Sequence, residues 1–256
     1  MTDLNVYPVR AFQDNYVWTL RQGNNAAVVD PGEAAPVLAF LHAQKLNLTA
    51  ILNTHHHADH VGGNAELLEH YPVPVYGPYD DRIPTVSERV REGDKFTLPG
   101  FGIEFEVLEI PAHTRTHIAF VGAGMVFCGD TLFACGCGRL FEGTPAQMHT
   151  ALTKLARLPG ATRVYCGHEY TLSNIKFARV VEAGNAELAQ WEQTAAALRA
   201  KDEPTLPSTL AQELRTNPFL RCSEAAVAAA ASKHAGHELS EPVSVLGALR
   251  EWKNSF

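Results

Sequence analysis

The sequence lacks the features of membrane-spanning proteins and of proteins that bind nucleic acids non-specifically. No apolar run approaches the roughly 20 residues that a membrane-spanning helix requires. Acidic residues outnumber lysine and arginine by 28 to 21, for a formal net charge of −7, whereas non-specific nucleic-acid binding needs a basic surface. The opening residues contain no basic segment followed by an apolar one, so no secretory signal is expected. We therefore expect a cytoplasmic globular protein that binds neither a membrane nor a nucleic acid.

Cysteine is also scarce. The five cysteines are Cys128, Cys135, Cys137, Cys166 and Cys222. Their number is odd and no CxxC pair occurs, which indicates neither a disulfide framework nor a zinc ribbon. We expect reduced thiols that serve mostly in packing.

The first two thirds of the chain alternate β-rich and helical stretches. Short β-rich runs at residues 4–9, 16–20 and 26–30, separated by polar or glycine-containing turns, predict an antiparallel meander. A second β-rich series falls between residues 96 and 130, and a last strand is predicted at residues 163–167. Two successive β-then-α halves permit two packed sheets with helices on the outside.

Helices are predicted between and after these strands. Residues 145–158 form the clearest one, with Thr144 as N-cap and Pro145 at the first helical position. Strand signals vanish after about residue 170. From there on, helices are predicted at residues 185–200, 206–216, 223–234 and 241–253.

Four histidines and an aspartate crowd into six positions of the stretch LNTHHHADHVGG, residues 52–63. His55 and His57 are two residues apart, so at the end of an extended strand both imidazoles point to one face and reach one metal ion. His56 then points away. A surface loop or a hydrogen-bonded histidine cluster is the alternative, but this spacing after an apolar strand favours metal binding.

A second ion is accessible from the same stretch. Asp59 and His60 come where the strand turns into a helix, so they diverge from the first pair, while Gly62 and Gly63 permit the tight turn that makes room. Imidazole and carboxylate ligands suit zinc, and also iron or manganese.

Further ligands are predicted just past the ends of other apolar runs. His113 comes at a strand-to-loop transition, whereas His117 is interpreted as a supporting or buried residue. Asp130 ends another strand, and its two carboxylate oxygens are able to bridge two ions. His168 follows the last strand.

Four segments, in this order, resemble the metallo-β-lactamase superfamily: THHHADH, PAHTRTH, FCGDTLF and CGHEY. With FQDNYVW, CGCGRLFEGT, NPFLR and the terminal LREWK, the pattern is similar to glyoxalase II, the hydroxyacylglutathione hydrolases. The resemblance implies an α/β (α+β) protein. It has a metallo-β-lactamase αββα sandwich as its catalytic domain, residues 1–170, and an all-helical C-terminal substrate-binding domain, residues 171–256.

The resemblance also implies a ligand set. One ion is held by His55, His57 and His113, the other by Asp59, His60 and His168, and Asp130 bridges them. Two divalent ions, with zinc first and iron or manganese as alternatives, share a hydroxide, so that Asp59 and Asp130 take part in catalysis.

The implied reaction is hydrolysis of the thioester of S-(2-hydroxyacyl)glutathione, chiefly S-D-lactoylglutathione, to glutathione and D-lactate. This is the second step of methylglyoxal detoxification. A thiol with a pKa of about 8.5 leaves with little acid catalysis, so a thioester suits a site without a spare acid.

Glutathione binding is assigned by the same resemblance to five residues: Arg139, Phe141, Tyr170, Arg250 and Lys253. Arg250 and Lys253 are three residues apart, which places them on one face of a helix. Some family members have lysine and tyrosine where this chain has Arg139 and Phe141. We expect that difference to affect substrate affinity and not the chemistry.

Other readings remain open from the sequence. The nearest enzyme is a persulfide dioxygenase with one iron, which would not need the long helical C-terminal region. A β-lactamase, a lactonase or a nuclease fits less well. A non-catalytic metal sensor would close its coordination shell, whereas hydrolysis needs an exchangeable position. The expected partner is a small glutathione thioester, and a monomer is expected.

Overall fold

The structure, a computed structural model, describes residues 3–256. Its contacts divide the chain into two compact units. The N-terminal unit comprises the residues up to Glu109 together with Thr116–Gly129. The C-terminal unit comprises Ile110–Arg115 and Asp130–Phe256.

The first sheet of the N-terminal unit has six strands in the order β1 to β6. Their bounds are β1 Asn5–Ala11, β2 Asn15–Gln22, β3 Asn25–Val29, β4 Asn47–Leu52, β5 Val75–Gly77 and β6 Glu88–Arg89. The first three pair antiparallel in sequence order, which confirms the predicted meander. From β3 onward the pairing is parallel, as the intervening helices α1 (Ala34–Gln44) and α3 (Asn64–His70) require.

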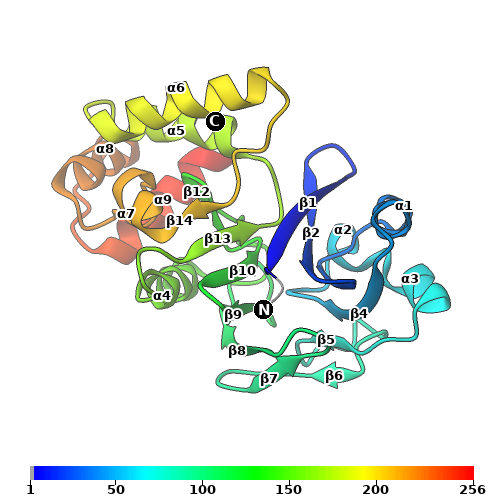
Figure 1. Ribbon diagram of the computed structural model, residues 1–256. Helices are drawn as coiled ribbons and strands as arrows, with labels where there is room; N and C mark the ends of the chain where they lie inside the picture. Colours follow the sequence, from blue (N-terminus) through cyan, green and yellow to red (C-terminus); the bar gives the residue numbers. More distant parts are fainter. Residues whose placement is uncertain (1–2) are drawn as a thin grey trace. The chain divides into compact units, whose positions relative to one another are not determined.

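Helices α1 and α3 pack on one face of this sheet (Figure 1). Val37 and Leu41 of α1 and Leu67 of α3 are fully buried in a cluster with Val28 of β3 and Ile51 of β4. Each such side chain stabilises the fold by about 1.5–3 kcal/mol when it leaves water. This apolar face holds β4 rigidly, and the histidine-rich stretch begins directly after that strand.

The second sheet of this unit contains four antiparallel neighbours, β7 (Lys95–Leu98), β8 (Ile103–Glu109), β9 (Ile118–Gly122) and β10 (Met125–Gly129). Tyr76 of β5 stacks on Phe96 of β7 with ring centroids 4.1 Å apart. The Thr49 hydroxyl of β4 donates to the Pro99 carbonyl at 2.7 Å. The two sheets therefore face each other within the unit, as the predicted sandwich requires.

The C-terminal unit is mainly helical. Its short strands are β11 (Leu132–Phe133), β12 (Gly136–Cys137), β13 (Arg163–Cys166) and β14 (Ser208–Thr209), paired β11 with β12 and β13 with β14. Its helices are α4 Pro145–Ala156, α5 Thr171–Val181, α6 Ala186–Ala200, α7 Leu210–Thr216, α8 Ala225–Ala235 and α9 Pro242–Asn254 (Figure 1).

Helix α4 begins as predicted. The Thr144 side chain accepts a hydrogen bond from the Gln147 amide at 3.3 Å, and the Gln147 side chain accepts one from the Thr144 amide at 2.9 Å. Pro145 occupies the first helical position, where its missing N–H costs nothing. This reciprocal pair is a capping box.

The structure corrects two expectations for the region after residue 170. Strand β14 occurs where no strand was expected, because the Ser208–Thr209 backbone pairs with the predicted strand β13. The predicted helix at residues 206–216 therefore begins only at Leu210, where Thr209 caps it by accepting from the Gln212 amide at 3.2 Å. Helix α5 lies in the region that was predicted to be helical, but its position was not predicted.

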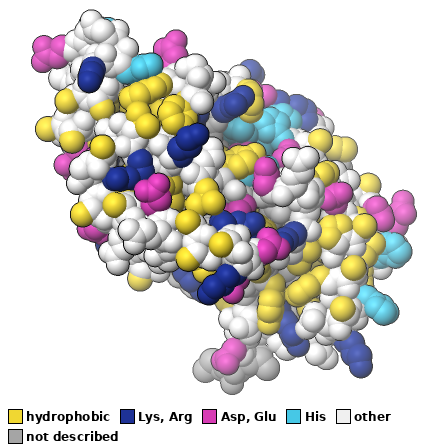
Figure 2. All heavy atoms as spheres, turned by 90° about the horizontal axis from the view of Figure 1, so that it is seen from above, with side chains coloured by type: hydrophobic (Ala, Val, Ile, Leu, Met, Phe, Trp, Pro, Cys, Tyr) yellow, Lys and Arg dark blue, Asp and Glu magenta, His cyan; other side chains and the backbone are white. Residues whose placement is uncertain are grey.

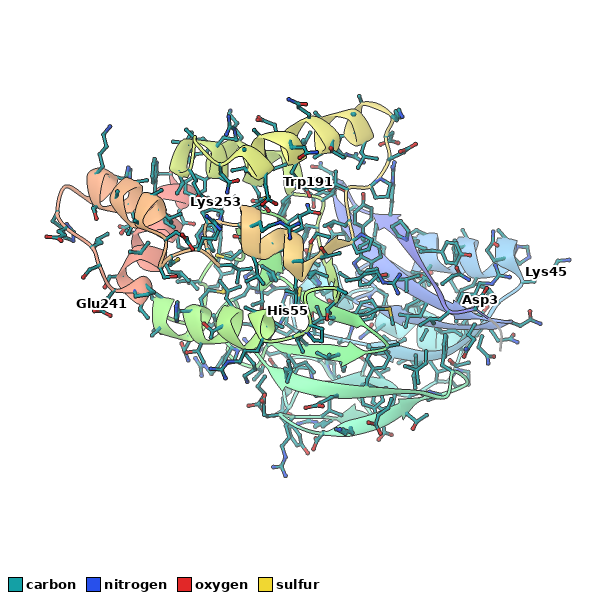
Figure 3. All side chains as sticks on the ribbon, turned by 60° about the vertical axis from the view of Figure 1, so that its left-hand side comes forward. Asp3, Lys45, His55, Trp191, Glu241 and Lys253 are labelled. Atoms are coloured by element: carbon teal, nitrogen blue, oxygen red, sulfur yellow. The ribbon has the colours of Figure 1, made fainter. Side chains whose placement is uncertain are left out.

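Helices α5 and α9 supply the aromatic core of this unit. Phe177 of α5 meets Trp252 of α9 edge to face, with ring centroids 5.4 Å apart. Helix α9 runs from its N-cap Glu241 toward Lys253 near its other end (Figure 3). The last turn of α9 carries Lys253.

The surface carries mixed charge. On the face drawn in Figure 2, lysine and arginine side chains are scattered among aspartate and glutamate. Within residues 3–256, no helix combines the length and the apolar character needed to cross a membrane.

Candidate functional site

The histidine-rich stretch lies in a loop between β4 and the short helix α2 (Ala58–Val61), and not at the end of a strand. His55 and His57 nevertheless converge, with His55 Nε2 3.2 Å from His57 Nδ1. His56 is directed elsewhere, and its Nδ1 lies 3.6 Å from a carboxylate oxygen of Asp80. The loop therefore produces the divergence that alternation in a strand was expected to produce.

Asp30, which the sequence analysis missed, orients two of these histidines. Its carboxylate accepts from the Thr54 amide and the Thr54 hydroxyl, each at 2.7 Å, and lies 3.1 Å from His60 Nδ1. Because the Thr54 hydroxyl proton is committed to Asp30, its oxygen accepts from His55 Nδ1 at 3.0 Å. In the neutral rings, His55 and His60 therefore carry their protons on Nδ1 and present Nε2 as a metal ligand.

Asn15 holds the proposed carboxylate ligand of the same loop. Its Nδ2 donates to Asp59 Oδ2 at 3.1 Å and to the Asp59 carbonyl at 3.3 Å. Asp59 Oδ2 in turn lies 3.5 Å from His60 Nε2. Asn15 belongs to the FQDNYVW segment, for which the sequence alone indicated no role.

The glycines near this loop serve close packing and not an unusual turn. Gly62 and Gly63 both have ordinary helical dihedrals, with φ of −60° and −82°. A Cβ on Gly32 would lie 2.0 Å from the Asp59 carbonyl oxygen, and one on Gly62 would lie 2.7 Å from the Gly32 carbonyl oxygen. The expectation of a tight turn is thus corrected: glycine is needed because backbone segments touch.

His117 has the supporting position that was expected of it. It is fully buried, and its Nδ1 lies 3.1 Å from the Ile118 carbonyl. Its ring stacks on His55 with centroids 4.5 Å apart. His117 therefore restricts the His55 ring by contact.

Three predicted ligands meet in the C-terminal unit. His113 Nε2 and His168 Nε2 lie 3.5 and 3.4 Å from Asp130 Oδ2, and all three residues are buried. His113 Nδ1 donates to the Arg139 carbonyl at 2.9 Å, so its Nε2 carries no proton in the neutral ring. Two acceptors facing each other repel unless a cation lies between them. Ligand atoms on a tetrahedral zinc, each about 2.1 Å from the ion, are themselves about 3.4 Å apart.

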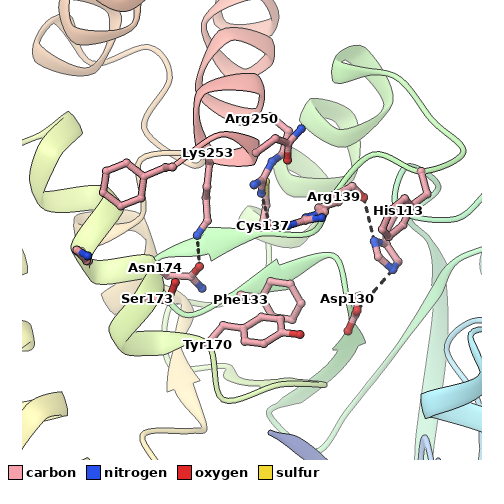
Figure 4. A pocket seen from close by; sticks show the side chains of 14 residues that line it. His113, Asp130, Phe133, Cys137, Arg139, Tyr170, Ser173, Asn174, Arg250 and Lys253 are labelled. Atoms are coloured by element: carbon pink, nitrogen blue, oxygen red, sulfur yellow. Dashed lines mark hydrogen bonds and ion pairs between the residues drawn. The ribbon is translucent and has the colours of Figure 1, made fainter. Parts of the chain in front are cut away.

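A cavity of about 610 Å³ opens beside these ligands, within the C-terminal unit (Figure 4). His113 and Asp130 line it, and four cationic side chains do as well: Arg139, Lys176, Arg250 and Lys253. Phe141 and Tyr170 also line it, so the structure brings all five predicted glutathione-binding residues to one cavity. Asn174, Ser173, Phe133 and Cys137 are further parts of the wall that Figure 4 shows.

Arg250 and Lys253 are held in place by neighbours inside the unit. Arg250 is buried, donates to the Cys137 carbonyl at 2.6 Å, and lies over the Phe219 ring. Lys253 donates to the Asn174 side-chain carbonyl. Burial, together with the neighbouring Arg250, lowers the pKa of Lys253 to about 8.

Aromatic rings cover two of the proposed ligands. Tyr170 stacks on His168 with ring centroids 4.7 Å apart, and Phe133 meets Tyr170 edge to face at 5.3 Å. Phe141 is 62% exposed and meets the His113 ring at 5.2 Å. These contacts limit water access to the imidazoles while leaving the cavity open.

Comparison with known families divides the chain at the same place as its motifs. Residues 12–168 match the family model described as metallo-beta-lactamase superfamily. Residues 169–256 match the model described as hydroxyacylglutathione hydrolase C-terminus.

Relatives match over nearly the whole length. The chain is 56% identical over 256 residues to a hydroxyacylglutathione hydrolase of Alkalilimnicola ehrlichii, covering 99% of each chain. It is 51% identical over 253 residues to one of Nitrosomonas europaea, covering 99% of this chain and 97% of the relative.

Solved structures agree on the fold. A protein crystallised in a di-iron-bound form superposes with a TM-score of 0.61 and 30% identity, over 84% of this chain and 100% of that one. ETHE1 from Myxococcus xanthus superposes with a TM-score of 0.63 at 22% identity, over 99% of each chain. With relatives matched from end to end and a metallo-β-lactamase fold, the chain belongs to the hydroxyacylglutathione hydrolase family of the metallo-β-lactamase superfamily.

Proposed function

We propose that the protein hydrolyses the thioester of S-(2-hydroxyacyl)glutathione, chiefly S-D-lactoylglutathione, to glutathione and D-lactate. This is the second step of methylglyoxal detoxification. The observation that carries the proposal is the cationic cavity bounded by His113 and Asp130. A ligand with two carboxylates and a scissile acyl group matches that combination, because the cations bind the carboxylates beside the residues that hold a metal.

The proposal assigns seven metal ligands. His55, His57 and His113 would hold one ion, Asp59, His60 and His168 would hold the other, and Asp130 would serve both. It is supported by the Nδ1 protonation of His55, His60 and His113, and by separations of 3.4–3.5 Å around Asp130 Oδ2. A divalent metal suits these donors, and we propose two zinc ions, with iron and manganese as alternatives. When bound, they activate water at neutral pH and polarise the acyl oxygen.

The side chains of the cavity bind the substrate. Arg139, Arg250 and Lys253 bind the carboxylates of glutathione, while Tyr170 and Phe141 contact its apolar surface. Glutathione leaves as a thiolate, whose conjugate acid has a pKa of about 8.5, so the site needs no strong general acid. Binding by remote charges raises the local concentration of the thioester and fixes its orientation.

The proposal also includes the division into two domains, the cellular location and the oligomeric state. Residues 1–170 form the catalytic domain and residues 171–256 the substrate-binding domain, which is supported by the two family matches that meet at residues 168 and 169. We propose a cytoplasmic monomer. A mononuclear persulfide dioxygenase is not favoured, because residues 169–256 match the hydroxyacylglutathione hydrolase C-terminus.

The test is thiol release from S-D-lactoylglutathione by the purified protein, with metal content determined on the same sample. Turnover with close to two metals per chain is expected. A fully metal-loaded protein without turnover would contradict the proposed activity, and active protein with one metal would contradict the dinuclear assignment.

A matched pair of variants tests the ligand assignment. His57→Ala is expected to lose metal and turnover, whereas His56→Ala, one residue away and directed toward Asp80, is expected to keep both metals. Equal loss of metal in the two variants would count against the assignment.

A further inference from the structure

One wall of the cavity is a hairpin with a strained turn. Phe133 of β11 and Cys137 of β12 line the cavity. Between the two strands, Cys135 has a φ of +56°, in the left-handed region that a residue with a Cβ avoids. Such a conformation persists only where its surroundings impose it. The groups that hold this turn therefore determine the shape of the wall.

A buried carboxylate holds the turn from behind. Glu213 of α7 has no solvent exposure and is not among the residues that line the cavity. Its Oε2 accepts from the Cys135 amide at 2.8 Å and from Asn217 Nδ2 at 3.0 Å. Asn217 Nδ2 also donates to the Phe133 and Gly136 carbonyls, at 3.0 and 2.9 Å. Glu213 and Asn217 together thus fix both sides of the hairpin turn.

Glu213 is connected to Arg250 by two series of contacts. In the first, Glu213 binds Cys135, and two residues further along the chain the Cys137 carbonyl accepts from the Arg250 guanidinium at 2.6 Å. In the second, Glu213 binds Asn217, whose Oδ1 accepts from the Phe219 amide at 3.1 Å, and the Phe219 ring lies 5.4 Å from the guanidinium carbon of Arg250. Both neighbours that define the position of this guanidinium are therefore set by residues that Glu213 contacts.

A carboxylate is a costly side chain at such a depth. Burial raises the pKa of Glu213 to about 7, against the opposing hydrogen bonds from the Cys135 amide and the Asn217 side chain. An apolar residue would avoid this cost but would leave the buried Cys135 amide without an acceptor. The presence of a buried glutamate at position 213 is therefore best explained by its hydrogen bond to the backbone amide of Cys135.

We propose that Glu213 is a positioning residue for the substrate cavity: it fixes the Ala134–Cys135 turn and Asn217, and through them the Arg250 guanidinium that binds glutathione. The inference rests on the proposed function, in which Arg250 binds a carboxylate of the substrate. Glu213 does not touch the substrate, so its removal affects binding and not the chemical step.

The test compares Glu213→Ala with Glu213→Gln in the full-length metal-loaded protein. Glutamine keeps a carbonyl acceptor for the Cys135 amide, whereas alanine removes it. With S-D-lactoylglutathione, Glu213→Ala is expected to raise KM by about tenfold with kcat within about twofold of the parent, and Glu213→Gln to keep KM within about threefold. Hydrogen–deuterium exchange over residues 132–139 is expected to accelerate in the alanine variant and to stay slow in the glutamine variant.

Glu182→Ala is the matched control. Glu182 is a carboxylate of the same unit whose partners are Arg221 and Asn185. Its loss is expected to lower Tm without raising KM. If Glu213→Ala fails to fold, Glu213→Asp replaces it, because aspartate keeps the charge but withdraws the carboxylate by one methylene.

The outcomes separate this proposal from the proposed function. An unchanged KM and unchanged exchange at residues 132–139 in Glu213→Ala would overturn the positioning role while the parent activity stands. The same KM increase in Glu182→Ala would also overturn it. A parent protein without thioesterase activity would contradict the proposed function, and the exchange measurement would still decide whether Glu213 fixes the turn.

Discussion

At the scale of single residues, Asp30 is the clearest addition to the predicted site. It accepts from Thr54 and His60 and so sets the protonated nitrogen of two proposed ligands, His55 and His60. Its signal in the sequence was an aspartate directly after an apolar strand, the same signal that singled out Asp130. Asp130 was proposed as a ligand from that signal, and the same signal was not applied to Asp30.

Replacing Asp30 with alanine should weaken metal binding. Without the carboxylate, the His60 and His55 rings lose the partners that orient them, and loss of such a partner costs about 10–100-fold in metal affinity. Metal affinity measured by competition with a chromophoric chelator checks this. His56→Ala is the control, and equal metal affinity in Asp30→Ala and the parent would contradict the role.

Lys253 should make substrate binding depend on pH. Its pKa is lowered to about 8, mainly by burial, so the ammonium is charged below that pH and neutral above it. KM is therefore expected to rise as pH increases through about 8, because a cation that binds a carboxylate is lost. Steady-state kinetics between about pH 6.5 and 9.5 measures this.

The Lys253→Arg variant tests whether loss of the charge on Lys253 causes the pH dependence of KM. Lys253→Arg stays charged across this range, so its KM is expected to vary less with pH than that of the parent. A parental rise in KM that persists unchanged in Lys253→Arg would assign the titration to another group.

At the scale of elements, local signals were sufficient where hydrogen bonds are local. The meander of β1 to β3 and the Thr144 N-cap of α4 depend on neighbours in the sequence, and both were predicted. Strand β14 depends on pairing with β13, in which Arg163 lies opposite Thr209 and Val164 opposite Ser208, and no local pattern encodes such a distant partner. Helix α5 was missed because its buried positions, such as Ile175 and Phe177, are mixed with polar residues.

The capping box of α4 gives a test at this scale. Thr144→Ala removes the acceptor for the Gln147 amide and is expected to lower the free energy of unfolding by about 1 kcal/mol. Thr144→Ser keeps a hydroxyl and should cost less. Denaturant titration of the two variants measures the difference, and equal stability of the alanine variant and the parent would show that the cap contributes nothing.

At the scale of the whole molecule, the net charge gave no indication of a cationic binding site. A chain with a formal charge of −7 presents four cationic side chains to one cavity, and these come from widely separated positions, 139, 176, 250 and 253. The resemblance identified three of them, and Lys176 was found only in the folded chain. Composition describes a sum over the surface, whereas binding depends on where each charge lies.

Metal removal should affect both stability and activity. A ligand that binds only the folded state stabilises it, by about 2.7 kcal/mol when present at 100 times its Kd. Dialysis against a chelator is therefore expected to lower Tm and to abolish thiol release, and added zinc should restore both. A Tm that does not respond to the chelator, with metal shown to be removed, would contradict metal binding by the folded protein.

The burial of all five cysteines has a consequence for an enzyme that produces a thiol. Burial raises the pKa of Cys135, Cys137 and Cys222, so little thiolate forms at these three positions. Thiolates are the species that exchange with disulfides, and exchange also requires access. Cys137 lines the substrate cavity, but it is buried and its pKa is raised. The protein is therefore expected to resist exchange with oxidised glutathione and to keep working when much of the surrounding glutathione is oxidised.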